Sequence, residues 1–279
     1  MYEELLRSYG YDNIPISIPK AGPIIKKRED NYHDIETYFQ LVNLYDEISL
    51  KSIPGSKIKF TSNNSNLSNT DNLCINAAEI LRNYVCKENC LNVSIDLQKN
   101  IPIGGGLGGG SSNAASVLVG LNNLWNCNLS INELNDLGKT LGSDVPVFIN
   151  GYSAFGKDTG TSLIKHELDK RYFLIVYPGI EVSSKDMYQN FKINDYINHI
   201  NLDNMHEYIG FNSFEELLCS RYHEIRELLD ILRKYNNGSV SGSGSCLFSI
   251  FDDEESAIKI SACLPKKYQT YVVHSLNTI

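Results

Sequence analysis

The sequence is poor in the features that mark membrane proteins and nucleic-acid-binding proteins. It has no apolar run of 18 residues, so no membrane-spanning helix is expected. Its 25 Lys and Arg residues are outnumbered by 33 Asp and Glu residues, which gives a formal net charge of −8. That balance disfavours a nucleic-acid or anionic-membrane partner, although a local basic site for a small phosphate compound is compatible with it.

Cysteine is present, but in no pattern that predicts a disulfide framework or a metal site. The seven cysteines are odd in number and scattered, and the opening MYEELLRSYG lacks the apolar core of a signal peptide. We therefore expect a cytoplasmic protein whose cysteines are reduced and mostly buried. Cys86 and Cys90 are spaced like half of a zinc site, but no second Cys/His pair stands at a suitable spacing, so no metal site is predicted.

Strand-like and helix-like segments are mixed along the chain, which predicts an α+β fold. A length of 279 residues suits two modest lobes, with a boundary near residue 160 that gives units 1–160 and 161–279. Strands are expected at 36–49, 91–97, 171–182 and 268–276, with a further strand after a small-residue turn within 238–251. Helices are expected at 73–85, 111–125, 130–142, 213–235 and 254–264. Capping boxes of Ser130 with Glu133 and of Ser213 with Glu216 predict two helix starts.

The first 27 residues are atypical because NIPISIPKAGPII, residues 13–25, contains three prolines. Proline lacks the backbone N–H and fixes φ, so this density rejects a regular helix and allows at most an interrupted edge strand.

A dense glycine run is the most informative feature of the chain. Residues 99–116 read KNIPIGGGLGGGSSNAAS, with six glycines within seven positions. A strand precedes the run and an Ala-rich helix follows it, whereas a flexible linker would not be framed in this way. Bare backbone at a helix N-terminus offers N–H groups and a positive dipole end to an anion. The pattern therefore predicts a phosphate-binding loop.

Two common phosphate motifs fit this run poorly. The Walker pattern needs Lys followed by Ser or Thr after the glycines, and no Lys follows here. Gly104, Gly106 and Gly109 satisfy the spacing of the dinucleotide fingerprint. That fingerprint also needs an acidic residue about twenty positions later, at the end of a second strand. Here that interval has helical periodicity, and the next acid, Glu133, belongs to a helix cap.

A third motif fits. The pattern P-x-G-x-G-L-G-x-x-S-S-x-A-A resembles the phosphate loop of the GHMP small-molecule kinases, and the matching residues are Pro102, Gly104, Gly106, Leu107, Gly108, Ser111, Ser112, Ala114 and Ala115. The resemblance continues through LGSDVPVFINGYSAFGKDTG, PGIEVSSKDMY and SGSGSCLFSIF and covers about residues 28–255. It implies a two-lobed α+β kinase that uses ATP and Mg²⁺. The residues it assigns to ATP are Pro102, Gly104, Gly105, Gly106, Leu107, Gly108, Gly109, Gly110, Ser111, Ser112, Asn72 and Lys99.

The resemblance is strongest to one branch of the family, which acts on a small-molecule substrate, a cytidine-diphosphate sugar alcohol, in isoprenoid precursor synthesis. By that match Asp144 is the catalytic base, Tyr32 and His33 bind the cytosine, and Tyr188 is a second stacking aromatic. On residue type alone, Asp144 also suits a turn or helix cap, and Tyr188 also suits a core position. The branch further implies a monomer or a weak homodimer.

One departure affects the catalytic assignment. The first motif of the family, P-A-K-I-N-L-x-L, places a Lys sixteen residues before the His, and that position is Ser17 here. Lys20 is the nearest lysine and would serve only if the register shifts by three residues. Three hypotheses therefore stay open: a kinase that uses Lys20, a nucleotide-binding homologue with impaired catalysis, and a GHMP kinase for another small alcohol.

Overall fold

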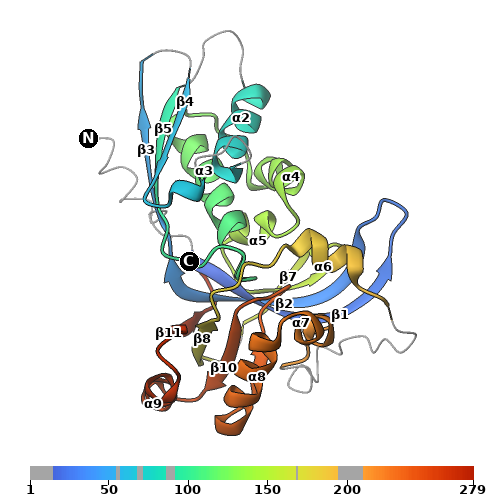
Figure 1. The fold of residues 1–279 in the computed structure, drawn as a ribbon. Coiled ribbons are helices and arrows are strands. Elements are labelled where there is room, and N and C mark those ends of the chain that lie inside the picture. The colour runs from blue at the N-terminus through green and yellow to red at the C-terminus, as the bar shows by residue number, and fades with distance from the viewer. Residues whose placement is uncertain (1–14, 55–56, 68–71, 86–91, 168, 194–209) are drawn as a thin grey trace.

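In a computed structural model, the structure describes residues 15–54, 57–67, 72–85, 92–167, 169–193 and 210–279, with the backbone alone for 15–21. Figure 1 shows a helix-rich upper part with a small sheet at its side, above a large curved sheet whose other face carries further helices. The predicted α+β class is confirmed. None of the helices in these ranges is both long and apolar enough to cross a membrane.

The upper part pairs a small sheet with the described helices α2 to α5. Its strand order is β3-β5-β4, antiparallel between β3 and β5 and parallel between β4 and β5. Val93, Ile95 and Leu97 alternate with more exposed residues along β5, so one face of the sheet packs under the helices. The elements are β3 (Glu47–Ser52), β4 (Ile58–Ser62), α2 (Leu73–Val85), β5 (Val93–Gln98), α3 (Gly109–Leu124), α4 (Ile131–Leu141) and α5 (Val145–Asn150).

The lower part is a large sheet of order β7-β6-β2-β11-β8-β10-β9. Outside this order, β1 pairs antiparallel with β2. The sheet takes strands from both sides of residue 160, and the boundary expected there stays a prediction. Its strands are β1 (Pro15–Lys27), β2 (His33–Tyr45), β6 (Ala154–Lys157), β7 (Ser162–Lys165), β8 (Tyr172–Tyr177), β9 (Gly238–Val240), β10 (Leu247–Phe251) and β11 (Gln269–Leu276). The accompanying helices are α6 (Ser184–Asn190), α7 (Glu215–Arg221), α8 (His223–Tyr235) and α9 (Glu254–Cys263).

A small apolar cluster joins the two parts under the glycine run. Ile101 and Leu107 are buried against Phe173, Ile175 and Phe248 of the large sheet. The loop that carries the glycines is therefore anchored at two apolar side chains, while the backbone between and after them stays available.

Several local predictions are confirmed. Helix α2 has the predicted bounds, and α4 begins at the predicted box, in which Ser130 Oγ accepts from Glu133 N and Glu133 accepts from Ser130 N. The interrupted edge strand is also confirmed: β1 pairs only along β2 among the described strands, and its register shifts at three places. Helix α3 begins at Gly109, two residues before the predicted start at Ser111.

Two predictions at the 213–235 segment are wrong. The expected single helix is broken at Tyr222, whose φ of −126° and ψ of 99° are extended, so that α7 and α8 are separate. The capping box of Ser213 and Glu216 is absent, because α7 begins after Phe214 without a side-chain cap. Asn212 Oδ1 accepts from Phe214 N at 2.8 Å instead, and Ser213 Oγ accepts from Ile24 N of β1 at 3.3 Å.

Candidate active site

The glycine run forms a loop whose backbone alternates in handedness. Gly104, Gly106 and Gly108 have φ of 64°, 69° and 68°, a left-handed region that side chains disfavour. At Gly106 the need for glycine is also steric, since a Cβ would lie 2.2 Å from the carbonyl oxygen of Ser241. Such alternation turns successive N–H groups towards one side and makes a concave anion site.

The carbonyl groups of this loop are bound from behind by the C-terminal half of the chain. The oxygens of Gly104, Gly105 and Gly106 accept hydrogen bonds at 2.8 to 3.3 Å, and the donors are the backbone N–H groups of Val182, Ser245 and Cys246 and the hydroxyl of Ser241. The N–H groups of residues 104–108 have no acceptor within the described ranges. The loop therefore offers unpaired donors on the side opposite to its bound carbonyls.

Helix α3 adds its N-terminus to the same site. Gly108 is the N-cap and supplies no side-chain acceptor, so the first N–H groups of the helix also face outwards unpaired by a cap. The dipole of this 16-residue helix favours negative charge at that end. Ser111 lies in the first turn and lines the cavity, whereas Ser112 is buried at 1% exposure and is not part of the lining.

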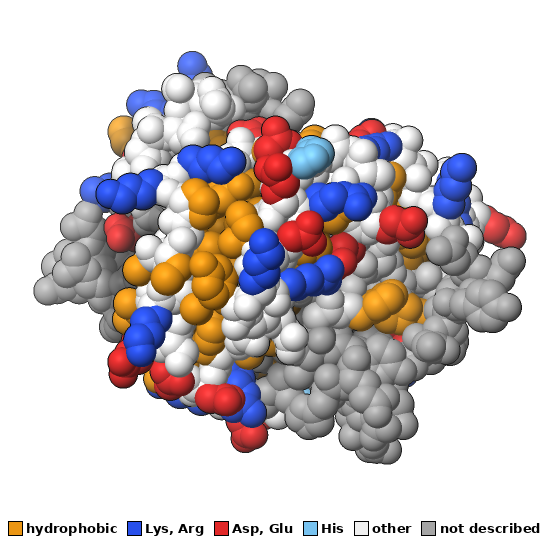
Figure 2. Space-filling view, turned by 60° about the horizontal axis from the view of Figure 1, so that its bottom comes forward, with side chains coloured by type: hydrophobic (Ala, Val, Ile, Leu, Met, Phe, Trp, Pro, Cys, Tyr) orange, Lys and Arg blue, Asp and Glu red, His pale blue; other side chains and the backbone are white. Residues whose placement is uncertain are grey.

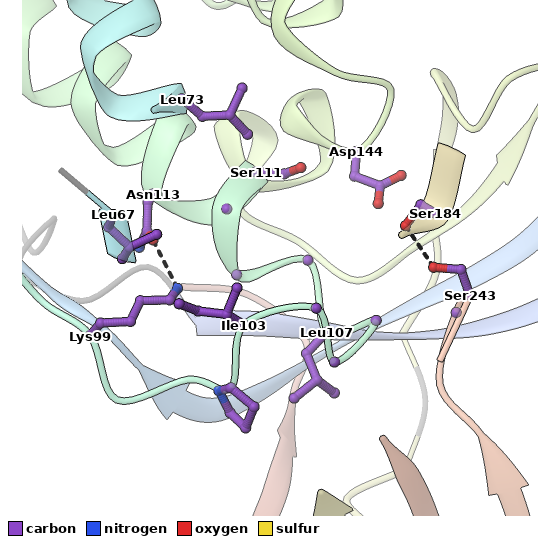
Figure 3. A pocket seen from close by; sticks show the side chains of 18 of the residues that line it. Leu67, Leu73, Lys99, Ile103, Leu107, Ser111, Asn113, Asp144, Ser184 and Ser243 are labelled. Atoms are coloured by element: carbon purple, nitrogen blue, oxygen red, sulfur yellow. Dashed lines mark hydrogen bonds between the residues drawn. The ribbon is translucent and has the colours of Figure 1, made fainter. Parts of the chain in front are cut away.

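The loop forms the floor of a cavity of about 390 Å³. Figure 3 shows Lys99, Asn113 and Leu67 on one side of the loop, with Asp144, Ser184 and Ser243 on the other. The lining thus brings together the predicted Asn72, Lys99, Asp144, Pro102 and all residues from Gly104 to Ser111. The cavity has a polar end at Asp144, and the end near Leu67 combines apolar and polar side chains. Its floor is rich in N–H donors. This arrangement suits an elongated phosphorylated ligand.

Asp144 is the acidic group of this cavity. It occupies the N-cap position of α5 but makes no capping hydrogen bond, so the helix-cap role is not realised. Ser143 Oγ lies 3.5 Å from its Oδ1, and Figure 3 shows the carboxylate directed towards Ser184 and Ser243. Burial raises the pKa of Asp144, and the Ser143 hydroxyl opposes that rise. Desolvation of this kind makes a carboxylate a better proton acceptor.

The opposite end holds Lys99 and Asn72, each bound to protein groups. The Lys99 ammonium pairs with Asp46 and donates to Asn113 Oδ1 at 3.0 Å. Asn72 Oδ1 accepts from Cys74 N at 2.8 Å and so holds the start of α2, while its Nδ2 donates to Leu67 O at 2.8 Å. Both side chains are fixed before any ligand binds.

The predicted cytosine-binding residues are only partly brought together, and none of the three belongs to the cavity lining. The rings of His33 and Tyr188 lie 5.2 Å apart, and Tyr188 also packs edge-on against Phe214 at 4.8 Å. Burial lowers the pKa of His33, and burial together with the charge of Asp144 raises the pKa of Tyr188. Tyr32 is 61% exposed in the hairpin between β1 and β2.

Lys20 lies in β1, where its backbone is opposite Tyr38, and Ser17 is opposite Leu41. The side chains of both residues lie outside the described part of the chain, as do Cys86 and Cys90. The register question posed by the departure from the family motif therefore stays a prediction.

Two residues that sequence reasoning missed are Asp46 and Asn113, which together bind Lys99. A signal for Asp46 exists in LYDEISL, where an acidic residue interrupts a strand-like run between β2 and β3. Asn113 follows the two serines of the loop motif, at a position that the motif leaves open.

Comparisons with known proteins agree with this geometry. The profile of the GHMP kinases N terminal domain matches residues 72–152, and that of the GHMP kinases C terminal matches residues 193–270. A 4-diphosphocytidyl-2-C-methyl-D-erythritol kinase of Wigglesworthia glossinidia brevipalpis is 38% identical over 90% of this chain and 83% of its own. The corresponding kinase of Colwellia psychrerythraea is 36% identical over 91% and 86%.

Solved structures are similar as well. A crystal structure of 4-(cytidine 5'-diphospho)-2C-methyl-D-erythritol kinase superposes with a TM-score of 0.81 at 26% identity, covering 94% of this chain and 98% of its own. A mevalonate kinase gives a TM-score of 0.69 at 15% identity, covering 95% and 98%, which shows the shared fold. The family profiles and the curated relatives lead to one conclusion: the chain belongs to the GHMP kinase family.

Proposed function

We propose that this protein transfers the γ-phosphate of ATP to the 2-hydroxyl of 4-diphosphocytidyl-2-C-methyl-D-erythritol, a step in isoprenoid precursor synthesis. One observation carries the proposal: the half-buried carboxylate of Asp144, which makes no helix-capping hydrogen bond, shares a cavity with a loop of unpaired N–H donors. A phosphate donor and a hydroxyl acceptor need these two groups side by side. The printed names of the curated relatives support the choice of acceptor.

The nucleotide fits along the floor of the cavity. Leu67 and Leu73 provide apolar contact for a base, and Asn72 and Lys99 provide polar groups at the same end. The phosphates then extend over residues 104–110 towards the N-terminus of α3, with Pro102, Leu107, Ser111 and Ser112 fixing the loop around them. Phosphoryl transfer needs mainly positioning and charge stabilisation, which this backbone cradle is built to supply.

Asp144 accepts the proton of the acceptor hydroxyl in this proposal. A bond forms between the acceptor oxygen and the γ-phosphorus, the bond from that phosphorus to the β,γ-bridging oxygen breaks, and the hydroxyl proton passes to the carboxylate. The pKa raised by burial makes Asp144 more basic than an exposed Asp, which favours this transfer near neutral pH.

A magnesium ion is part of the proposal, and the cavity residues fit an ion that is bound mainly by the phosphates of the nucleotide. No group of three or more His, Cys, Asp or Glu side chains that would hold a metal is found in the described ranges. Mg²⁺ in kinases is commonly held by phosphate oxygens and water with only one or two protein oxygens. Ser111 is an oxygen donor that the cavity offers at its phosphate end. When bound, the ion would neutralise charge on the phosphates.

The cytidine end of the acceptor is assigned to Tyr32, His33 and Tyr188. The rings of His33 and Tyr188 lie 5.2 Å apart in a tilted arrangement, which supports their assignment to one site, and Tyr188 is near enough to Asp144 for that charge to raise its pKa. A heterocycle held there would extend its diphosphate and sugar alcohol towards the carboxylate. An exposed aromatic, Tyr32, provides a second face for stacking.

A second candidate is a nucleotide-binding protein that does not transfer phosphate. The observation that favours it is Ser17 at the position of the family lysine, with Lys20 as its replacement only after a shift of three residues. A kinase for another small alcohol is the third candidate, and the neighbouring rings of His33 and Tyr188 argue against it.

The test is ATP consumption with the proposed acceptor and Mg²⁺, using the wild-type protein, Asp144→Asn and Lys20→Ala. We expect wild-type turnover, loss of turnover by at least 100-fold in Asp144→Asn, and unchanged binding of MgADP in that variant. Loss in Lys20→Ala as well assigns the lysine role to Lys20. Binding of both ligands without wild-type turnover supports the second candidate, and turnover that does not distinguish cytidine compounds from free alcohols supports the third.

A further inference from the structure

Asp46 is a buried carboxylate for which the proposed chemistry has no use. It stands alone between β2 and β3, and its side chain has 0% exposure. A buried carboxylate is costly unless hydrogen bonds and an opposite charge surround it. Its four partners account for that requirement. Oδ1 accepts from the backbone N–H groups of Asn100 at 2.7 Å and Ile101 at 2.9 Å, and Oδ2 accepts from Asn113 Nδ2 at 3.0 Å and from the Lys99 ammonium.

These partners lie on the two sides of the phosphate loop. Asn100 and Ile101 precede it, and Asn113 lies in the first turns of α3, which follow it. One carboxylate from outside the loop therefore joins the segment where the loop begins to the helix where it ends. The span that it closes contains all six glycines, whose backbone freedom would otherwise have to be lost when a ligand binds.

Asp46 also determines where the positive charge of the cavity lies. Lys99 has a side-chain exposure of 6% and lines the cavity, and its ammonium contacts both Asp46 and Asn113. The ammonium also lies close to the first turn of α3, because a Cβ placed on Gly109 would lie 3.0 Å from Lys99 Nζ. Asn113 completes a triangle, since its Oδ1 accepts from Lys99 while its Nδ2 donates to Asp46.

We propose that Asp46 is a positioning residue for nucleotide binding, acting through Lys99: it holds the Lys99 ammonium beside the first turn of α3 and keeps the phosphate loop in its binding form. The proposal rests on the proposed use of ATP. It predicts that Asp46 affects the affinity for the nucleotide but not the affinity for the acceptor.

The test uses Asp46→Asn. This change keeps an acceptor at Oδ1 for the two N–H groups, and it places an amide NH₂ opposite the Lys99 ammonium and the Asn113 amide. We expect the dissociation constant for MgADP, measured by titration calorimetry, to rise at least tenfold, about 1.4 kcal/mol. KM for ATP should rise in parallel, with KM for the acceptor and kcat within threefold of wild type. A purely structural role predicts a lower melting temperature and a smaller active fraction with unchanged affinity, and that result overturns the proposal.

Asp96→Asn is the matched control. Asp96 lies on β5 and accepts from Thr61 Oγ1 at 2.6 Å and Gln98 Nε2 at 3.0 Å, on the sheet face away from the cavity. It removes the same charge and should leave MgADP affinity within twofold of wild type. An equal loss in this control overturns the proposal, because general electrostatics would then explain both.

A double-mutant cycle keeps the test decisive. If Asp46 acts through Lys99, Asp46→Asn should change MgADP affinity by less than threefold in a Lys99→Met background, and a larger change overturns the proposal. The double variant removes both buried charges together, so it remains informative if Asp46→Asn alone does not fold. A wild-type protein that binds no MgADP refutes the proposed function and this inference with it. Wild-type binding that equals that of Asp46→Asn refutes the inference alone.

Discussion

Substituting Gly106 by Ala should be among the most damaging small changes in this chain. Its φ of 69° costs an alanine about 1–2 kcal/mol. The added Cβ would also lie 2.2 Å from Ser241 O and 2.7 Å from Gly244 O, both of them backbone atoms that cannot rotate away. Relieving such an overlap by a backbone shift costs about 1–3 kcal/mol more. The total is a substantial share of a typical stability of about 5–15 kcal/mol.

Gly179→Ala is the matched control for Gly106→Ala. Gly179 has a φ of 81° but nothing within 4 Å of its Cβ position, so the substitution carries the left-handed strain without the collision. Thermal and urea unfolding of both variants should place Gly106→Ala lower by about 1–3 kcal/mol, or about 2–12 °C in melting temperature. MgADP affinity should fall only in Gly106→Ala. Equal destabilisation of the two variants would refute the claim that close backbone contact, in addition to handedness, requires this glycine.

Three further changes test the surroundings of the site. Burial raises the pKa of Asp144 in the folded state, so the charge on Asp144 destabilises the fold above that pKa. Asp144→Asn should therefore raise the free energy of unfolding at pH 7, and this gain should vanish as the pH falls towards 3.8. Urea unfolding at a series of pH values measures both effects. Leu107→Ala should cost about 2–5 kcal/mol in the same assay, since Leu107 is 1% exposed, and an unchanged midpoint would contradict its anchoring role. With a thiol reagent followed by peptide mass spectrometry, exposed Cys263 should react long before Cys74 and Cys246, whose pKa values burial raises, and early labelling of Cys246 would contradict the packing under the loop.

The sequence was sufficient to predict elements whose stabilising contacts lie within a few residues of one another. The box of Ser130 and Glu133 lies within one helical turn, and both of its hydrogen bonds form as predicted. The conformation of the glycine run is also determined locally, because alternating left-handed glycines before a helix favour an anion-binding loop. The glycine run therefore predicted a phosphate loop, whereas Asn72, Lys99 and Asp144 were assigned only through the resemblance to the GHMP kinases; the structure places all of them around one cavity.

Predictions failed where distant parts of the chain compete for a residue. Leu218 and Ile225 are seven positions apart, so the apolar period is the same whether or not the backbone becomes extended at Tyr222 between them. Ser213 is an acceptable helix cap by residue type, but its hydroxyl accepts a hydrogen bond from Ile24 N in the irregular part of β1. The two residues are 189 positions apart in the sequence. Asp46 was missed for the same reason, since its partners lie 53 to 67 positions along the chain.

The hydrogen bonds that hold the loop carbonyls have a consequence for synthesis of the chain. The donors at Ser241, Ser245 and Cys246 are made about 140 residues after the glycines that they orient. A nascent chain that has reached only α5 possesses the glycines and the helix behind them, but lacks the groups that turn the carbonyls away. Contacts of such sequence separation form late. A ribosome-bound chain should therefore gain its nucleotide affinity abruptly, once β10 has left the exit tunnel, rather than when the glycine loop itself emerges.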